Sequence, residues 1–209
     1  MINDKNLLLA VANYYSAKLA QHGQTPQGAD WNSQESQTLR FEQLTRVIRP
    51  GPPFSVNDLG CGYGALYDYL CNSFGTFSYT GCDISESMIS AAQERQRKHN
   101  LRFLVASVPP EVADYGVASG IFNVRLGYQD AEWRLYLEST IDALDRTSRL
   151  GFAFNSLSSY SDPARMRDYL YYADPSSLFD LCKRRYSRQV ALLHDYGLYE
   201  FTIIVRKQP

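Results

Sequence analysis

The sequence lacks a surplus of charge of either sign, with 21 Lys and Arg residues against 22 Asp and Glu residues and a formal net charge of -1. A chain without such a surplus has no general attraction for a nucleic-acid backbone or an anionic membrane surface, so we expect neither as a partner. It also lacks any run near the roughly 18 apolar residues that a membrane span requires. Its four cysteines show no paired metal-ligand spacing, which predicts no metal site and favours a reduced, cytoplasmic protein.

The N-terminal 50 residues have the pattern of two helices. The apolar run at residues 6–12 follows Asp4, and Leu8, Val11, Tyr15 and Leu19 continue it as a helical stripe, which indicates an amphipathic helix rather than a signal peptide. A second helix is expected up to the Pro-Gly-Pro-Pro cluster at residues 50–53. We therefore expect residues 1–50 to form a helical extension that covers a cofactor or acceptor, and residues 51–209 to form the main domain.

In the main domain, strand-like and helix-like segments alternate. The clearest helix is 131–147, where Trp133, Leu137, Ile141 and Leu144 keep one face apolar. Such alternation predicts an α/β, Rossmann-like fold with a mostly parallel sheet and helices on both faces. The expected strands are 54–59, 78–83, 101–106, 115–124 and 150–157, and the expected helices among them are 65–74, 87–99 and 131–147.

The C-terminal end departs from this alternation. Asp174 and Pro175 are a good N-cap and first-turn pair for a helix, and two strand-like runs follow at 189–194 and 199–206. The connection between these runs is so short that it can join only antiparallel neighbours. The sequence therefore predicts seven strands, mostly parallel, with a C-terminal antiparallel hairpin.

A glycine-rich turn follows the first expected strand of the domain. Gly60, Gly62 and Gly64 stand at alternate positions, where the lack of Cβ atoms lets a ligand approach the backbone and permits the positive φ angles of a sharp turn. Asp83 lies 23 residues after Gly60, at the end of the second strand, where a carboxylate can accept two hydrogen bonds from a ribose diol.

These glycines fit two kinds of cofactor. The spacing Gly60-x-Gly62-x-x-Ala65 matches the loose dinucleotide fingerprint, so a nicotinamide-dependent oxidoreductase is one alternative. Asp58, two residues before the first glycine, and Gly64 favour a different motif. The pattern Asp-x-Gly-x-Gly-x-Gly resembles motif I of the class I S-adenosylmethionine-dependent methyltransferases.

The resemblance covers about residues 54–207 and implies a set of cofactor contacts. Asp58 would help to anchor the methionine end of S-adenosyl-L-methionine, Gly60, Gly62 and Gly64 would pass beside it, Asp83 would hold the ribose, and Ile84 would pack on the adenine. Many members carry an acidic residue after the third strand, where this sequence has Ser107, so Ser107 or a backbone carbonyl would take its place. The product would be S-adenosyl-L-homocysteine. The segment around Trp31 resembles the region before motif I, and Arg40 is a candidate partner for the methionine carboxylate.

Candidates for the reaction itself come from the rule that ligands lie at the carboxyl edge of an open α/β sheet. That edge is predicted to carry Asn123 and Arg125 after the fourth strand, residues 155–160 after the fifth, and His194 and Asp195 after the sixth. His194, or else Asp195, is the candidate base for an acceptor that must lose a proton. A purely structural role for His194 in the hairpin turn remains equally open.

An insert at residues 158–174 is rich in tyrosine and leaves the same edge. Tyr160, Tyr171 and Tyr172 are candidates for one wall of an acceptor pocket, with Tyr14, Tyr15 and Trp31 of the N-terminal extension for the other. This density of aromatic side chains favours a small, partly apolar acceptor. We expect methylation on oxygen or nitrogen rather than on carbon. A non-catalytic sensor of S-adenosylmethionine is the alternative from another functional class.

Overall fold

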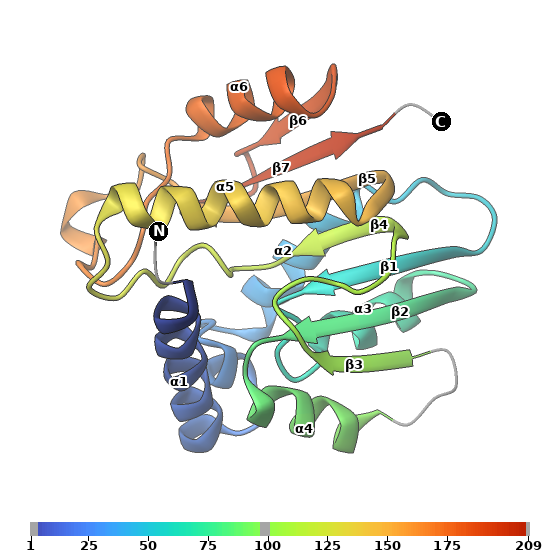
Figure 1. The fold of residues 1–209 in the computed structure, drawn as a ribbon, viewed down its shortest axis with the longest axis horizontal. Coiled ribbons are helices and arrows are strands. Elements are labelled where there is room, and N and C mark those ends of the chain that lie inside the picture. The colour runs from blue at the N-terminus through green and yellow to red at the C-terminus, as the bar shows by residue number, and fades with distance from the viewer. Residues whose placement is uncertain (1–3, 97–100, 208–209) are drawn as a thin grey trace.

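The computed structural model describes residues 4–96 and 101–207, and its central feature is a seven-stranded sheet (Figure 1). Six strands run in the same direction, and the strand that comes last in the sequence runs antiparallel to both of its neighbours. The sheet order is β3-β2-β1-β4-β5-β7-β6, which confirms the predicted fold class. The strands are β1 (Phe54–Leu59), β2 (Phe77–Asp83), β3 (Leu101–Val105), β4 (Ala113–Ala118), β5 (Ser148–Leu157), β6 (Gln189–Leu193) and β7 (Glu200–Arg206).

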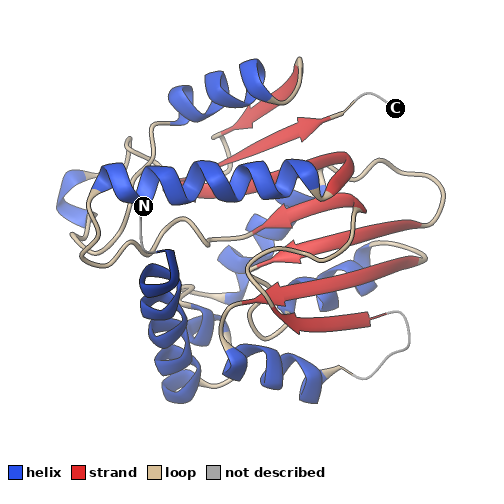
Figure 2. Cartoon of the chain, in the orientation of Figure 1, coloured by secondary structure: helices blue, strands red, loops and turns tan. Residues whose placement is uncertain are grey.

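Helices cover both faces of this sheet (Figure 2). One core contains buried side chains of α2 (Gln34–Thr45), α3 (Ala65–Ser73) and α4 (Glu86–Arg95), and a second contains those of α5 (Asp130–Arg146) and α6 (Pro175–Arg185). Strand side chains alternate between the two cores: Ala153 packs in the first, whereas Phe152 and Phe154 pack in the second. This alternation is the expected consequence of a strand that is buried on both sides.

The N-terminal helix α1 (Asp4–His22) lies beside the carboxyl ends of the central strands, where the arrowheads of β1 and β2 point (Figure 1). It contacts α4 and the short helix η1 (Pro26–Ala29), and its Leu7 and Val11 pack with Trp133 of α5. The second N-terminal helix belongs to the main core, because Leu44 is fully buried there. The boundary near residue 50 therefore separates two stretches of sequence that share one hydrophobic core.

Three predicted element ends differ from the structure. β4 ends at Ala118 rather than at residue 124, because Gly120 has a φ of 75° and its N–H donates to the Asn155 side chain instead of to a neighbouring strand. The apolar residues Phe122 and Val124 resemble a strand in sequence, but they are buried as part of an irregular turn. Helix α2 ends at Thr45, a few residues before its predicted end. Helix α4 ends at Arg95, and residues 97–99 of its predicted range lie outside the described residues.

The tyrosine-rich insert contains only the short helix η2 (Pro163–Arg165). Isolated bridges pair Val124 with Leu170 and Ser158 with Ala173, so both ends of the insert are fixed to the edge of the sheet. Within the described ranges, no helix combines the length and the hydrophobicity needed to cross a bilayer.

Candidate active site

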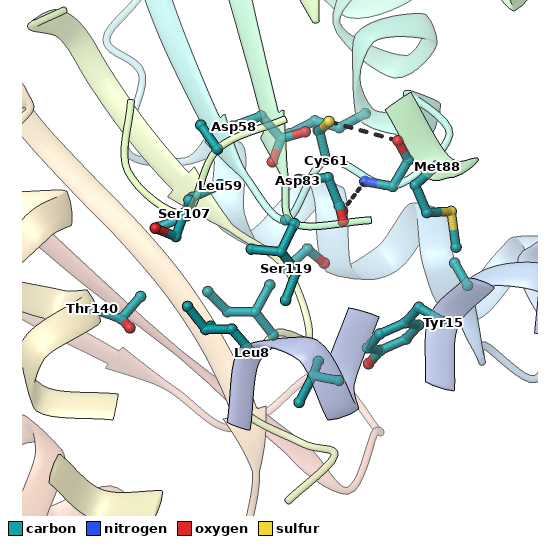
Figure 3. A pocket seen from close by; sticks show the side chains of 18 of the residues that line it. Leu8, Tyr15, Asp58, Leu59, Cys61, Asp83, Met88, Ser107, Ser119 and Thr140 are labelled. Atoms are coloured by element: carbon teal, nitrogen blue, oxygen red, sulfur yellow. Dashed lines mark hydrogen bonds between the residues drawn. The ribbon is translucent and has the colours of Figure 1, made fainter. Parts of the chain in front are cut away.

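A cavity of about 320 Å³ opens at the carboxyl edge of the sheet (Figure 3). That volume lies at the lower end of the range for small-molecule sites. Side chains from the glycine turn, the end of β2, the segments after β3 and β4, and helices α1, α2 and α5 surround it. Of the residues predicted to bind a cofactor or acceptor, those that line the cavity are Tyr15, Trp31, Asp58, Gly60, Gly62, Asp83, Ile84 and Ser107.

The glycine turn is held against β2 by its own backbone. The N–H groups of Gly60 and Cys61 both donate to the carbonyl oxygen of Cys82, at 2.7 and 3.0 Å. Gly60 has a φ of 77°, and a Cβ atom there would lie 2.0 Å from Cγ2 of Ile121. Only glycine satisfies both conditions, so the turn presents bare main chain to the cavity.

Asp83 is fixed in orientation by the same turn. Its Oδ2 accepts a hydrogen bond of 2.9 Å from the Gly62 N–H (Figure 3). Its Oδ1 accepts another of 2.9 Å from the Ser85 N–H. Burial raises the pKa of this carboxyl above its usual value, and the backbone N–H bonds oppose the rise. Each carboxylate oxygen can accept further hydrogen bonds, so Asp83 can receive both hydroxyls of a ribose diol.

Asp58 lies deeper, at the end of β1, and is 2% exposed. Its Oδ2 accepts a hydrogen bond of 2.5 Å from the hydroxyl of Tyr79. Burial raises the pKa of Asp58 to about 7, the hydrogen bond from Tyr79 opposes that rise, and the nearby carboxylate of Asp83 adds to it. A bound cation beside Asp58 would favour its ionised form.

Gly64, the third glycine of the motif, does not line the cavity. It caps the start of α3 with a φ of 85°, and a Cβ atom there would lie 2.9 Å from Cζ of Phe103. Its positive φ and its close packing against β3 therefore explain this glycine without a ligand. The expected cofactor contact of Gly64 is not part of the observed lining.

On the far side of the glycine turn, the cavity continues to α5. Ser107 lies at the exposed rim, and Ser119, directly after β4, places its hydroxyl in the wall (Figure 3). Within the described ranges, the Ser119 Oγ is buried and has no hydrogen-bond partner. A buried hydroxyl without a partner is costly, which fits a position that a polar ligand completes.

The N-terminal segment forms the opposite wall. Tyr15 of α1 extends to the cavity from the same helix as Leu8 (Figure 3). Trp31, in the loop before α2, and Gln37, in the first turns of α2, also line it. The Trp31 ring covers Gly120 so closely that a Cβ atom at residue 120 would lie 2.3 Å from Cη2 of the indole. Tyr14, also considered for this wall, instead donates its hydroxyl to Asp30 at 2.7 Å.

The structure does not bring Arg40 to the cavity. Its guanidinium lies 4.1 Å from the Trp31 ring centroid and forms two hydrogen bonds with the carboxylate of Glu200, at 2.8 and 2.9 Å. Its remaining nitrogen donates to the Ser36 carbonyl at 2.6 Å. Because these donors already have partners, the structure offers no support for a bond from Arg40 to a methionine carboxylate.

The polar residues predicted to follow β4 have structural partners instead of facing the cavity. Asn123 accepts a hydrogen bond from the Leu157 N–H at 3.0 Å. Arg125 donates to the carbonyl oxygens of Tyr128, Asp168 and Leu170 and pairs with Asp130. Arg125 thereby fixes the insert to the segment after β4, and Asn123 fixes that segment to the end of β5. Neither residue lines the cavity.

The remaining candidates also lie away from the cavity. His194 and Asp195 are exposed at the end of β6, where His194 packs beside Tyr160 and Phe201. Tyr160 is 72% exposed, Tyr171 packs partly buried against the α5 and α6 core, and the Tyr172 hydroxyl accepts a hydrogen bond from the Arg167 N–H. The separation has a topological cause: β6 is the outermost strand of the sheet, whereas the cavity lies over β1, β2 and β4.

Several residues that line the cavity were not predicted from the sequence. Ser119 and Ile121 would have been found by the carboxyl-edge rule if the fourth strand had been ended at residue 118. Gln37 and Phe41 lie on the inner face of α2, and Tyr136 and Thr140 on the inner face of α5. Their helical periodicity is indistinguishable from that of ordinary core positions.

A sheet of this order, with a carboxylate held beside a bare glycine turn at its carboxyl edge, is typical of class I methyltransferases. Comparison with known proteins agrees. The family model described as a methyltransferase domain matches residues 56–145. A Mycobacterium tuberculosis protein, Rv1506c, that is named as a methyltransferase is 60% identical over 164 residues, which span 78% of this chain and 98% of that protein. The chain belongs to the class I S-adenosylmethionine-dependent methyltransferases.

More distant relatives share one region or the fold alone. The trans-aconitate 2-methyltransferase of Rhodopseudomonas palustris is 33% identical over 107 residues, covering 46% of this chain and 40% of that protein. Among solved structures, the complex of DhpI with S-adenosylhomocysteine has a TM-score of 0.65 at 16% identity and covers 97% of this chain and 98% of that one. The cofactor is S-adenosylmethionine, and the glycine turn, Asp83 and the unpartnered Ser119 hydroxyl make a cavity that suits it.

Proposed function

We propose that this methyltransferase transfers the methyl group of S-adenosylmethionine to oxygen or nitrogen of a small-molecule acceptor held between α1, α2 and the glycine turn. The observation that carries the proposal is the position of Asp83: its carboxylate is oriented by Gly62 and Ser85 and still has lone pairs directed to the cavity. Within this proposal Asp83 binds the ribose, Ile84 contacts the adenine, and Asp58 lies toward the cationic methionine end.

When bound, the cofactor supplies a methyl group already activated by positive sulfur. The bond from that methyl to an acceptor lone pair forms as the carbon–sulfur bond breaks, and the electron pair of the broken bond stays on sulfur. The chain's own residues therefore have mainly to align the acceptor and to exclude water. Trp31, Tyr15 and Phe41 serve that purpose, because they close the cavity with large, largely apolar side chains.

A dedicated base is not part of the proposal. No histidine stands among the described residues that line the cavity. A hydroxyl or a neutral amine becomes positively charged when it accepts the methyl group and can then release its proton to water. A protonated amine has no lone pair, so it must lose a proton to water before transfer. His194 and Asp195 stay predictions, and their exposed position on the outer strand does not favour them.

Transfer to oxygen has support from one named relative. A Paenibacillus protein that is 30% identical over 97 residues is a malonyl-[acyl-carrier protein] O-methyltransferase by name. The match covers 45% of this chain and 34% of that protein. A cytoplasmic location is also part of the proposal, since all four cysteines are free thiols, as is usual in reducing compartments.

Two measurements test this function. Titration calorimetry should show binding of S-adenosylhomocysteine and no binding of NADH. Transfer of radiolabelled methyl from S-adenosylmethionine to a panel of hydroxyl-, amine- and carbon-nucleophile acceptors should then give labelled O- or N-methyl product. Labelling only at carbon, or only of protein or nucleic acid, would contradict the proposed acceptor class.

A further inference from the structure

We propose that the acceptor is an uncharged, largely apolar hydroxy compound, bound against α1 with its oxygen near the hydroxyl of Tyr15. The inference rests on the proposed function and narrows its substrate class. It depends on the composition of the N-terminal wall, on the pairing of the nearby cations and on one hydroxyl without a partner.

The N-terminal wall contains no charged side chain. Between residues 4 and 41, the cavity is lined by apolar residues and by the uncharged polar side chains of Tyr15 and Gln37. Gln37 is already engaged, since its amide lies 3.3 Å from the hydroxyl of Tyr63. The apolar members of this wall are Leu8, Val11, Ala29, Trp31 and Phe41.

The cations beside this wall are neutralised by partners. Arg40 is paired with Glu200, and Lys18 is paired with Asp30 at 2.7 Å. Among the described lining residues, Arg146 is the one basic side chain, and it comes from the last turn of α5 rather than from the N-terminal wall. A negatively charged acceptor at the N-terminal wall would therefore lose its hydration without gaining a counter-charge.

The charged side chains that line the cavity also disfavour an anionic acceptor. Asp58 and Asp83 both line it, so their carboxylates repel an anion and attract the cationic cofactor. An uncharged acceptor gains from burial against the apolar wall without meeting this repulsion.

Tyr15 supplies the hydrogen bond that such an acceptor needs. Its ring lies edge-on to Tyr14, and its hydroxyl has no hydrogen-bond partner among the described residues. Burial raises the pKa of Tyr15, with the carboxylates of Asp30 and Asp83 adding to the effect, so the hydroxyl keeps its proton and can donate. A single neutral donor in an apolar wall selects an acceptor with one or a few oxygens rather than a polyanion.

The test uses the protein loaded with S-adenosylhomocysteine and two probes of matched size, 4-fluorophenol and 4-fluorobenzoate, followed by fluorine NMR at neutral pH. The phenol is uncharged and the benzoate is an anion under these conditions. The phenol is expected to bind at least about tenfold more tightly than the benzoate. Equal or tighter binding of the benzoate, or no binding of the phenol, would overturn the inference.

Two variants of α1 locate the binding. Leu8→Trp fills the cavity and should abolish phenol binding, whereas Leu9→Trp, at a neighbouring position that is 60% exposed, should leave it unchanged. Phenol binding that survives Leu8→Trp would place the probe elsewhere and overturn the inference. Tyr15→Phe removes only the hydroxyl and should weaken phenol binding several-fold, even if Leu8→Trp fails to fold.

The cofactor serves as the separate control. If S-adenosylhomocysteine binds while the phenol does not, only the acceptor class is wrong. If S-adenosylhomocysteine itself does not bind, the proposed function fails and this inference fails with it.

Discussion

Arg40 and Glu200, which are 160 residues apart in the sequence, form a buried ion pair with two parallel hydrogen bonds. Glu200 also accepts a hydrogen bond from Asn155 at 2.9 Å, and Asn155 accepts one from the N–H of Gly120 at 2.7 Å. The pair therefore connects α2 to the turn after β4. Because the Trp31 ring lies between the guanidinium and Gly120, the pair also fixes one wall of the cavity.

Removal of one partner should be far more costly than the loss of a surface charge. Arg40→Met leaves the Glu200 carboxylate buried without its counter-ion, so we expect the free energy of unfolding in urea to fall by about 3–5 kcal/mol. Arg46→Met, at an exposed position one turn and a half further on, should change it by less than about 0.5 kcal/mol. The double variant Arg40→Met, Glu200→Gln should recover part of the loss; no recovery would mean that the charge of Glu200 is not the cause.

Asp83 should determine cofactor affinity. Asp83→Asn removes a charged acceptor of the ribose hydroxyls, so we expect S-adenosylhomocysteine binding to weaken by about 1–3 kcal/mol in titration calorimetry. Glu86→Gln removes an exposed carboxylate three residues further on and is the matched control, with unchanged affinity expected. Circular dichroism must show an intact fold, because Asp83 also binds the Gly62 and Ser85 N–H groups. An unchanged dissociation constant for Asp83→Asn would remove the residue from the site.

Asp58 should make cofactor binding depend on pH. Its pKa of about 7 in the ligand-free protein means that a proton must leave before a cation is bound beside the carboxylate. S-adenosylmethionine carries a positive sulfur, so its affinity should rise between about pH 6 and 8 and then level off. Asp58→Asn should abolish this rise, and Tyr79→Phe should move it to higher pH by removing the hydrogen bond that stabilises the carboxylate.

The stability of the ligand-free protein should fall, rather than rise, as the pH increases through the pKa of Asp58. Because the folded-state pKa of Asp58 lies above the ordinary value of 3.8, the folded state holds the proton more tightly than the unfolded state. The contribution of Asp58 to stability is therefore fully present below pH 3.8 and is lost as the pH rises through about 7. The difference in unfolding free energy between the wild type and Asp58→Asn, measured across this range, reports that loss.

Gly60 should tolerate no side chain. Gly60→Ala places a Cβ against Ile121 and forces alanine into the left-handed region, which alone costs about 1–2 kcal/mol. We expect a lower melting temperature and weaker binding of S-adenosylhomocysteine. Gly75→Ala, where nothing lies near the added Cβ, is the control and should change neither. Adding Ile121→Ala should relieve the clash but not the backbone strain, so recovery should be partial.

The glycine turn and Asp83 could be predicted from the sequence because their positions depend on neighbouring residues and on the spacing between two strands. Gly60 and Gly62 are required by the backbone of a turn, and Asp83 follows at the end of the next strand, so spacing alone places all three at the edge of the sheet. The mostly parallel sheet and the C-terminal hairpin were predicted from hydrophobic alternation and a short connection, and the structure confirms both.

The acceptor side could not be predicted because it depends on contacts between distant segments. Nothing near Arg40 in the sequence indicates that Glu200 will bind its guanidinium. The apolar residues Phe122 and Val124 are buried in a turn, and by resembling a strand they moved the expected strand end past Ser119 to Asn123 and Arg125. An apolar pattern reports burial and leaves the backbone conformation undetermined.

The last prediction concerns Ser119, whose loss should affect stability and ligand affinity differently. In the ligand-free protein its buried hydroxyl has no partner among the described residues, so Ser119→Ala should leave the free energy of unfolding unchanged or raise it slightly. If a polar atom of the cofactor completes this hydroxyl, the same variant should weaken S-adenosylhomocysteine binding by about 0.5–1.5 kcal/mol, the usual net value of one hydrogen bond.

The chain contains a matched control for that variant. Ser148 carries the other buried hydroxyl without a partner in the described ranges, but it packs against Gly116 and lies outside the cavity. Ser148→Ala should therefore have the same small effect on unfolding and no effect on affinity. Equal affinities for the two variants would show that the Ser119 hydroxyl does not contact the cofactor. Weaker binding for Ser119→Ala alone would show that the Ser119 hydroxyl gains its hydrogen-bond partner when the ligand binds. Loss of the same oxygen atom would then lower the affinity for the ligand while leaving the stability of the ligand-free protein unchanged or slightly higher.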